Sequence, residues 1–169
     1  MKINASRTIR NLTLICAGVI VIYSCTSSET PTPSPQDPDA ALFAEVVASG
    51  YTYYQAGAAL PGMGPHGDIK IRFNATAAGA LDGTGELPVG NSFPTGSILV
   101  KEVHNGSTLT LYAVMKKDPS NSNAGSGWLW AEYLPSGGVI ASVKDKGANC
   151  VSCHSLTPNR DLSRAFDLH

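Results

Sequence analysis

The stretch GDIKIRF, residues 67–73, alternates apolar side chains with the charged Lys70 and Arg72. Successive side chains of a β-strand point to opposite faces, so a period of two is typical of a strand with one buried face and one hydrated face. The stretch therefore predicts a half-buried strand, and the same kind of pattern continues through most of the chain that follows.

Four further strands are predicted downstream, separated by joints rich in Gly and Asn such as HNGS and SNSNAGSG. They lie at residues 96–103 (GSILVKEV), 109–115, 127–134 (GWLWAEYL) and 137–143 (GGVIASV). Strands that succeed one another at hairpin spacing favour an antiparallel sheet. The sheet is therefore expected to be the main element of the fold.

A helix is predicted before the sheet, in DAALFAEVVAS at residues 39–49. Asp37 suits the N-cap and Pro38 suits the first helical position, while Gly50 supplies a stop. Four apolar residues recur at helical spacing on one face: Leu42, Phe43, Val46 and Val47.

The N-terminus has the features of an export signal. Residues 1–10 carry three basic residues and no acid, and residues 12–23 are almost wholly apolar. A basic region followed by so short an apolar core predicts a signal peptide and not a membrane-spanning helix. The run ends in VIYSCTSS, which resembles a bacterial lipobox and so implies cleavage before Cys25 and lipidation of its sulfur. The alternatives are a plain signal peptide cut nearby and an uncleaved membrane anchor.

These features divide the chain into three expected segments. Residues 1–24 are the signal peptide, residues 25–38 hold the lipidated cysteine and a linker rich in Pro, Ser and Thr, and residues 39–169 form one domain. Removal of residues 1–24 takes away three of the twelve basic residues and none of the thirteen acids, which leaves a net charge of −4. A mildly acidic chain argues against binding of nucleic acid, which requires a concentrated basic face.

Residues 147–156, GANCVSCHSL, place Cys150 and Cys153 three positions apart with His154 directly behind. C-x-x-C-H is the attachment signature of c-type haem, in which two thiols form thioethers with the porphyrin vinyl groups and the histidine becomes the proximal iron ligand. Because this attachment is made outside the cytoplasm, the motif agrees with the export signal. One covalent haem c is expected in residues 39–169.

Other interpretations of the cysteine pair are less well supported. A disulfide would suit an oxidising compartment, and a thioredoxin-like redox pair would require a βαβ unit that the pattern lacks. A zinc site would require two further ligands, and His66, His104 and His169 are scattered. The expected fold class is therefore α+β: mainly an antiparallel β-sheet, with an N-terminal helix and a C-terminal segment for c-type haem attachment.

The order of these motifs resembles that of the cytochrome P-460 family, which includes cytochrome c-prime-beta. The similar stretches run from about Met63 to Asp161: HGDIKIRFN, FPTGSILVKE, MKKD, GWLWAEY and CVSCHSLTPNRD. The resemblance implies an antiparallel sheet, a homodimer, one haem per subunit and a five-coordinate iron with His154 as proximal ligand. Ordinary class I cytochromes c differ, because they are helical and carry the motif near the N-terminus.

The resemblance also draws attention to Lys101. In the hydroxylamine-oxidising members of the family a lysine is covalently joined to the porphyrin, and by motif that lysine is Lys101. The residues themselves make it unusual, because the strand at 98–103 is apolar on both faces. A lysine in such a strand either extends to water at an edge or points into a site.

The distal side of the haem is harder to predict. The hydroxylamine-oxidising members place a carboxylate there, and the corresponding position is interpreted as Ala113. Glu102 falls on the face opposite Lys101 by strand alternation, and Glu132 is assigned no role, so the sequence predicts no positioned base. The c-prime-beta members instead line this side with phenylalanine, for which Phe93 and Phe73 are the candidates unless they are simple core residues.

Three functions remain open. The leading hypothesis is an exported cytochrome with an open distal site that binds or redox-processes small nitrogen-oxide ligands such as nitric oxide. The alternatives are a hydroxylamine-oxidising enzyme with a Lys101 cross-link, and a membrane-tethered electron carrier whose sixth iron ligand is Met63, Met115, His66 or His104. A redox partner protein and a periplasmic or cell-envelope location, with Cys25 as the lipid anchor, complete the prediction.

Overall fold

The computed structural model describes residues 37–62 and 67–169. The predicted signal peptide, Cys25, nearly all of the linker, and the ligand candidates Met63 and His66 lie outside the described residues. None of the helices in the described part of the chain has the length and apolar character needed to cross a membrane.

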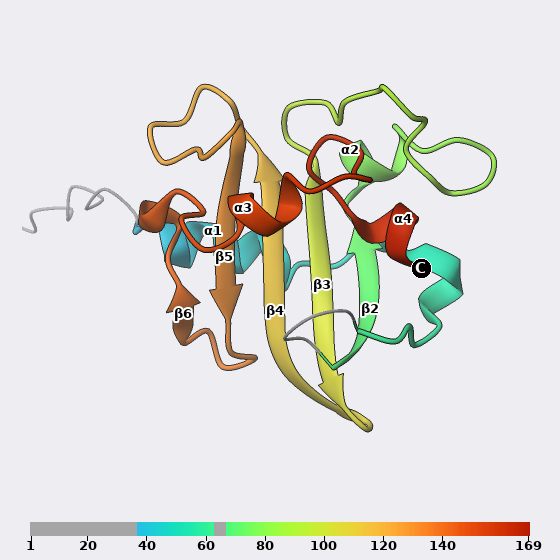
Figure 1. Ribbon diagram of the computed structural model, residues 1–169. Helices are drawn as coiled ribbons and strands as arrows, with labels where there is room; N and C mark the ends of the chain where they lie inside the picture. Colours follow the sequence, from blue (N-terminus) through green and yellow to red (C-terminus); the bar gives the residue numbers. More distant parts are fainter. Residues whose placement is uncertain (1–36, 63–66) are drawn as a thin grey trace, which may run out of the picture. The chain divides into compact units, whose positions relative to one another are not determined.

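Six strands form one sheet in sequence order, and each pairs with the next in antiparallel fashion (Figure 1). They are β1 (Thr52–Tyr53), β2 (Asp68–Phe73), β3 (Ile98–Asn105), β4 (Thr108–Lys117), β5 (Trp128–Tyr133) and β6 (Val139–Ala141). The prediction of an antiparallel sheet is confirmed. β1 was missed because two residues are too few to show a period.

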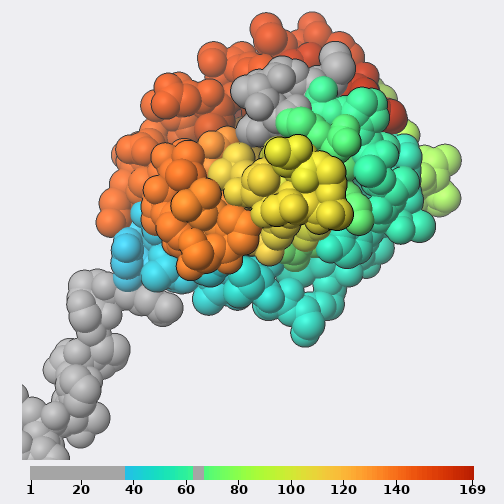
Figure 2. Space-filling view, turned by 90° about the horizontal axis from the view of Figure 1, so that it is seen from below, coloured from blue at the N-terminus to red at the C-terminus, as the bar shows by residue number. Residues whose placement is uncertain are grey.

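Short helices connect and cover the sheet. They are α1 (Pro38–Val46), α2 (Ala75–Ala78), α3 (Val151–His154) and α4 (Ala165–Leu168), with the 3₁₀ turns η1 (Tyr54–Gly57) and η2 (Val143–Asp145). Figure 2, seen from below, shows α1 (blue) on one side of the strands and the C-terminal segment (red) on the other. The sheet is therefore packed on both faces.

The alternation along β3 decides which residues face each layer. Val100 belongs to the core under α1, whereas Leu99 belongs to the core under the C-terminal segment. Lys101 follows Leu99 by two positions and shares its face, because side chains alternate along a strand. Glu102 lies on the α1 face, where its carboxylate accepts a 2.6 Å hydrogen bond from the buried Arg72.

Helix α1 differs in two details from the expectation. The side chain of Asp37 does not cap the helix; it lies 3.0 Å from Lys144 Nζ in an exposed ion pair. Of the expected apolar face, Leu42 and Val46 are buried, but Val47 follows the last helical residue and is 51% exposed. The apolar face is narrower than the sequence suggested because the helix ends before Val47.

The core under the C-terminal segment contains a group of packed aromatic rings. Phe166 of α4 lies 5.9 Å from Phe73 and 6.5 Å from Phe93, and Trp128 contacts Phe93 edge-on at 5.8 Å. Such pairs add about 0.5–1.5 kcal/mol each beyond the burial of their area. They join α4 to the sheet and so fix one side of the cavity described below.

Candidate haem site

The cysteine–histidine motif forms a single helical turn over the sheet. Cys150 immediately precedes α3 and is half-buried, whereas Cys153 is exposed, and neither is in a disulfide. The turn starts at Gly147, whose carbonyl oxygen accepts hydrogen bonds from the backbone N–H groups of Cys150 (2.9 Å) and Val151 (3.0 Å). Both thiols and His154 line one cavity.

Two contacts orient the ring of His154. Nδ1 lies 2.8 Å from the carbonyl oxygen of Leu162, and the Trp130 ring packs edge-on at 4.9 Å. A carbonyl oxygen only accepts hydrogen bonds, so Nδ1 carries the proton in this contact, and the lone pair of the neutral ring is on Nε2. A histidine held in this way has the tautomer that a metal ligand requires.

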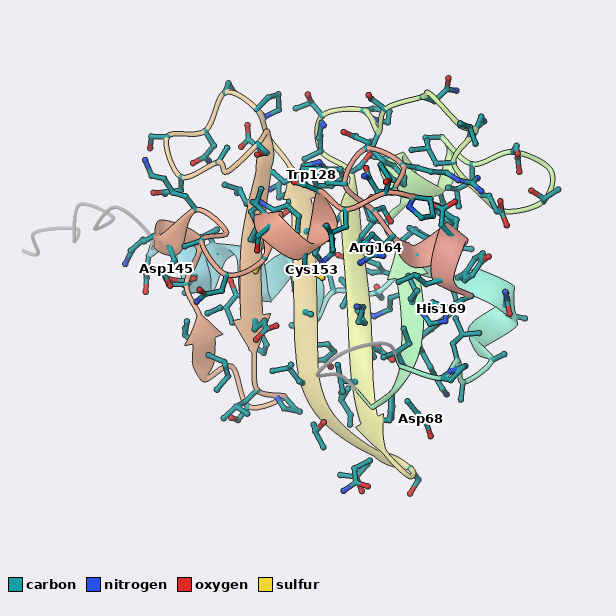
Figure 3. The ribbon with its side chains drawn as sticks, viewed as in Figure 1. Asp68, Trp128, Asp145, Cys153, Arg164 and His169 are labelled. Carbon is teal, nitrogen blue, oxygen red and sulfur yellow. The ribbon has the colours of Figure 1, made fainter. Side chains whose placement is uncertain are left out.

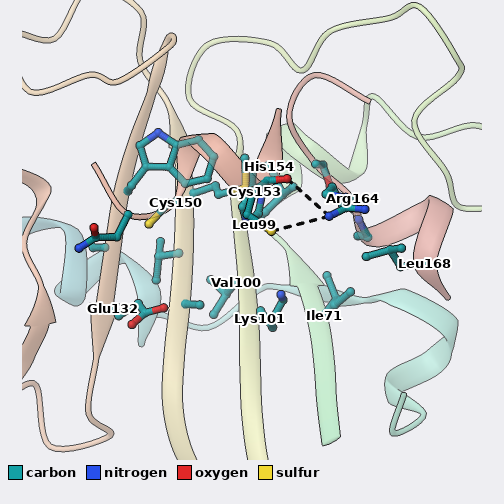
Figure 4. Close-up of a pocket in the computed structure, with 18 of the residues that line it drawn as sticks. Ile71, Leu99, Val100, Lys101, Glu132, Cys150, Cys153, His154, Arg164 and Leu168 are labelled. Atoms are coloured by element: carbon teal, nitrogen blue, oxygen red, sulfur yellow. Dashed lines mark hydrogen bonds between the residues drawn. The ribbon is translucent and has the colours of Figure 1, made fainter. Parts of the chain in front are cut away.

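The cavity has a volume of about 390 Å³, within the range of sites that hold small molecules and cofactors. Figure 4 shows Cys150, Cys153 and His154 on one side of it, with Lys101 and Glu132 on the strands that face them. The strands also contribute Ile71, Leu99, Ala113, Met115 and Trp130. The cavity is therefore mainly apolar with a few charged groups.

Lys101 lies in the cavity and not at an edge of the sheet. β3 is an inner strand, with β2 on one side and β4 on the other, so Lys101 cannot reach water around an edge. Burial lowers the pKa of its ammonium group below the usual value; the neighbouring Cys153 and Glu132 oppose this shift, and Arg164 adds to it. Of the two interpretations left open by the sequence, the structure supports the one in which Lys101 points into a site.

The strand register places Glu132 in the same row across the sheet as Lys101. Lys101 pairs with Ala113 of β4, and Ala113 pairs with Glu132 of β5. Glu132 also lines the cavity, and burial together with its charge raises the pKa of the Cys150 thiol. No role for Glu132 was predicted, although the alternation in WLWAEY places it on the same face as Trp130.

The other predicted distal residues fall in different places. Phe73 and Phe93 are not among the residues that line the cavity; both are almost fully buried in the aromatic group. Met115 lines the cavity, whereas His104 lies 3.7 Å from Glu102 on the α1 face. Thus only Met115, among the sixth-ligand candidates in the described residues, reaches the site.

Arg164 and His169 complete the wall of the cavity next to α4, and neither lies in a periodic sequence pattern that would have predicted this position (Figure 3). The Arg164 guanidinium donates to the carbonyl oxygen of Cys153 at 3.5 Å. Within residues 37–62 and 67–169, Arg164 Nε and His169 Nδ1 are buried without a hydrogen-bond partner. The pKa of His169 is lowered mainly by burial and, to a smaller extent, by the charge of Lys101.

These residues fit haem. Two unbridged thiols and an oriented histidine share one mainly apolar cavity, and the unpartnered nitrogen atoms of Arg164 and His169 are left for polar atoms of a bound group. A zinc site is less suitable, because the described residues contain no group of three or more His, Cys, Asp or Glu side chains that could hold a metal ion.

The fold and the site define a haem-binding cytochrome. The family model described as cytochrome P-460 matches residues 65–163, from before β2 to beyond the haem motif. The match covers more than half of the chain, and the chain belongs to the cytochrome P-460 family. No curated protein matches it.

Proposed function

We propose that this chain is an exported c-type cytochrome that carries one covalent haem and binds or redox-processes small nitrogen-oxide ligands such as nitric oxide. The observation that carries the proposal is the cavity shared by Cys150, Cys153 and His154. Cys150 and Cys153 would each hold the porphyrin through one thioether, formed when the S–H bond adds across a vinyl group, with the sulfur on one carbon and the hydrogen on the other. When bound, haem supplies one-electron chemistry and an open coordination position.

The other residues of the cavity have supporting roles. His154 would hold the iron through Nε2, and Arg164 Nε and His169 Nδ1 would serve polar atoms of the cofactor. The apolar side chains of Ile71, Leu99 and Met115 line the cavity, in place of the phenylalanines that the family resemblance implied. An apolar lining of this kind favours small neutral ligands over anions.

The first experiment compares the exported protein with the Cys150→Ala/Cys153→Ala variant. Denatured wild-type protein should keep one haem, measured by mass and by its absorption, and the variant should lose it. Nitric oxide should then shift the spectrum of the dithionite-reduced protein. A haem-loaded protein that fails to bind nitric oxide contradicts the proposal, and a sharp low-spin spectrum would favour the electron carrier.

A matched pair of variants tests where the ligand binds. Ala113→Leu adds volume to the cavity lining between Lys101 and Glu132 and should slow nitric oxide binding, whereas Ala58→Leu adds the same atoms at an exposed position. Equal rates for both variants would place the binding position elsewhere.

A second candidate, hydroxylamine oxidation, is favoured by the row of Lys101, Ala113 and Glu132. This reaction requires a base that removes protons from the bound nitrogen, and Glu132 supplies a carboxylate on the cavity face. The lowered pKa of Lys101 leaves more of its amine in the neutral, nucleophilic form. Glu132 is therefore the candidate for the base that the sequence did not predict at the Ala113 position.

Peptide mapping and one substitution test this candidate. A cross-linked Lys101 would be recovered on a haem-bearing tryptic peptide, and Glu132→Gln would abolish hydroxylamine turnover while nitric oxide binding persists. Glu45→Gln, at an exposed position outside the cavity, is the control. A free Lys101 peptide together with full turnover by Glu132→Gln would eliminate the candidate.

The remaining features of the proposal concern location and assembly. Lipidation at Cys25 would anchor the protein in the periplasm or cell envelope, and Cys25→Ser should release it from the membrane fraction. The protein is further proposed to form a homodimer, which sedimentation would test. It is also proposed to exchange electrons with a redox partner protein, which stopped-flow oxidation of the reduced protein would test.

A further inference from the structure

We propose that Asp161 is a positioning residue for His154: its carboxylate holds a strained turn whose carbonyl oxygen binds His154 Nδ1, and it thereby tunes the reduction potential of the iron. The inference rests on the proposed attachment of haem through His154. It concerns a different property, namely how the protein adjusts the electron donation of the proximal ligand.

The turn is a two-residue hairpin after α3. Arg160 and Ser163 exchange backbone hydrogen bonds of 2.7 and 2.9 Å, and Asp161 and Leu162 lie between them. Their φ angles are +51° and +66°, the positive values that a type I′ turn requires at both central positions. Left-handed backbone is unfavourable for Leu, so the surrounding structure must hold the turn in this form.

The Asp161 carboxylate supplies that restraint. One oxygen lies 2.7 Å from Lys117 Nζ, and the other accepts a 2.8 Å hydrogen bond from the backbone N–H of Phe93. The Asp161 and Lys117 side chains are only 11% and 14% exposed, and Lys117 Nζ also lies 4.8 Å over the Trp128 ring. The turn is thus fastened both to the end of β4 and to the segment before β3.

This restraint is transmitted to His154 through one atom. The carbonyl oxygen of Leu162, next to Asp161, lies 2.8 Å from His154 Nδ1. A firm hydrogen bond at Nδ1 increases the basicity of Nε2, which stabilises ferric iron and strengthens the iron–histidine bond. A loosened turn should therefore raise the reduction potential and weaken that bond.

Two substitutions of opposite charge separate this effect from simple electrostatics. Asp161→Asn removes a negative charge and Lys117→Gln removes a positive charge, so through-space effects on the potential have opposite signs. Both substitutions break the ion pair that holds the turn to the end of β4, and both haem-loaded variants should therefore have a raised potential. Asp68→Asn is the control, because it also removes one negative charge but at the exposed first residue of β2, away from the turn (Figure 3).

The potential is measured by spectroelectrochemistry, and the iron–histidine stretching frequency of the ferrous protein by resonance Raman scattering. The expected result is a higher potential and a lower frequency in Asp161→Asn and Lys117→Gln, and no change in frequency in Asp68→Asn. Potentials that shift in opposite directions with unchanged frequencies would overturn the inference.

If Asp161→Asn does not fold, Lys117→Gln decides the question alone. Its charge change would lower the potential, so an increase supports the inference and a decrease refutes it. Wild-type protein that carries no haem would instead refute the proposed function, so the two failures are distinguishable.

Discussion

Replacement of Gly147 by Ala tests whether the close approach of the haem motif to β5 organises the site. Gly147 is buried with a φ of +69°, and a Cβ there would overlap the Trp130 indole, with Nε1 only 2.8 Å away. Trp130 cannot move easily, because it is 2% exposed and its Nε1 donates to the carbonyl oxygen of Gly125 at 2.8 Å. The left-handed backbone costs about 1–2 kcal/mol and the overlap about 1–3 kcal/mol.

Urea unfolding of the haem-loaded proteins should therefore show that Gly147→Ala loses about 2–5 kcal/mol. Two glycines provide controls: Gly85 has a φ of +82° and no neighbour within 4 Å of a Cβ, and Gly83 has neither constraint. Gly85→Ala should lose only about 1 kcal/mol, and Gly83→Ala should be neutral or gain up to about 1 kcal/mol. A Gly147→Ala protein as stable as Gly85→Ala would show that the contact with Trp130 contributes nothing.

Three further tests address the α1 face of the sheet. Glu102→Leu leaves the buried Arg72 unpaired and should cost about 3–5 kcal/mol in urea unfolding, and the double variant with Arg72→Met should recover much of it. Asp39→Ala removes the acceptor of the Val143 backbone N–H, 2.8 Å away, and should cost about 2–4 kcal/mol by the same measurement. Burial and the Asp39 charge raise the pKa of Tyr133 well above 10, so its contribution to stability is present below pH 10 and is lost as the pH rises further. The free energy of unfolding of Tyr133→Phe should therefore fall less between pH 8 and pH 11 than that of the wild type.

The period-two patterns predicted most of the sheet because each strand has to bury one face. The alternation of Ile69, Ile71 and Phe73 predicted the orientation of β2, and the apolar residues on both faces of the strand at 98–103 singled out Lys101, which lines the cavity. The apolar pattern alone, however, did not distinguish residues of the hydrophobic core from residues that line the cavity. Phe73 was a candidate for the distal side, but it packs against other rings, since nothing in its local sequence says which apolar residues line a cavity.

The features that the sequence did not predict depend on pairing between distant segments. Glu132 enters the cavity row only through its register with Ala113, and a count of positions along one strand cannot supply the register of the next. Arg164 and His169 follow the haem motif in a segment whose one helix, α4, is too short to show a helical period. Their place beside the cavity comes from the packing of Phe166 on the sheet.

The two faces of the sheet depend on one another through β3. Lys101 and Glu102 are adjacent, so a slip of one residue in strand register would turn Lys101 towards α1 and Glu102 into the haem cavity. The buried hydrogen bond between Arg72 and Glu102 opposes such a slip, because a slipped strand would leave the Arg72 charge unpaired on the α1 face. The ion pair thus fixes which residue of β3 faces the haem although neither of its members touches the cavity. We therefore expect the Arg72→Met/Glu102→Leu variant to recover stability but to hold Lys101 in a less defined position. Its haem absorption bands should be broader than those of the wild type.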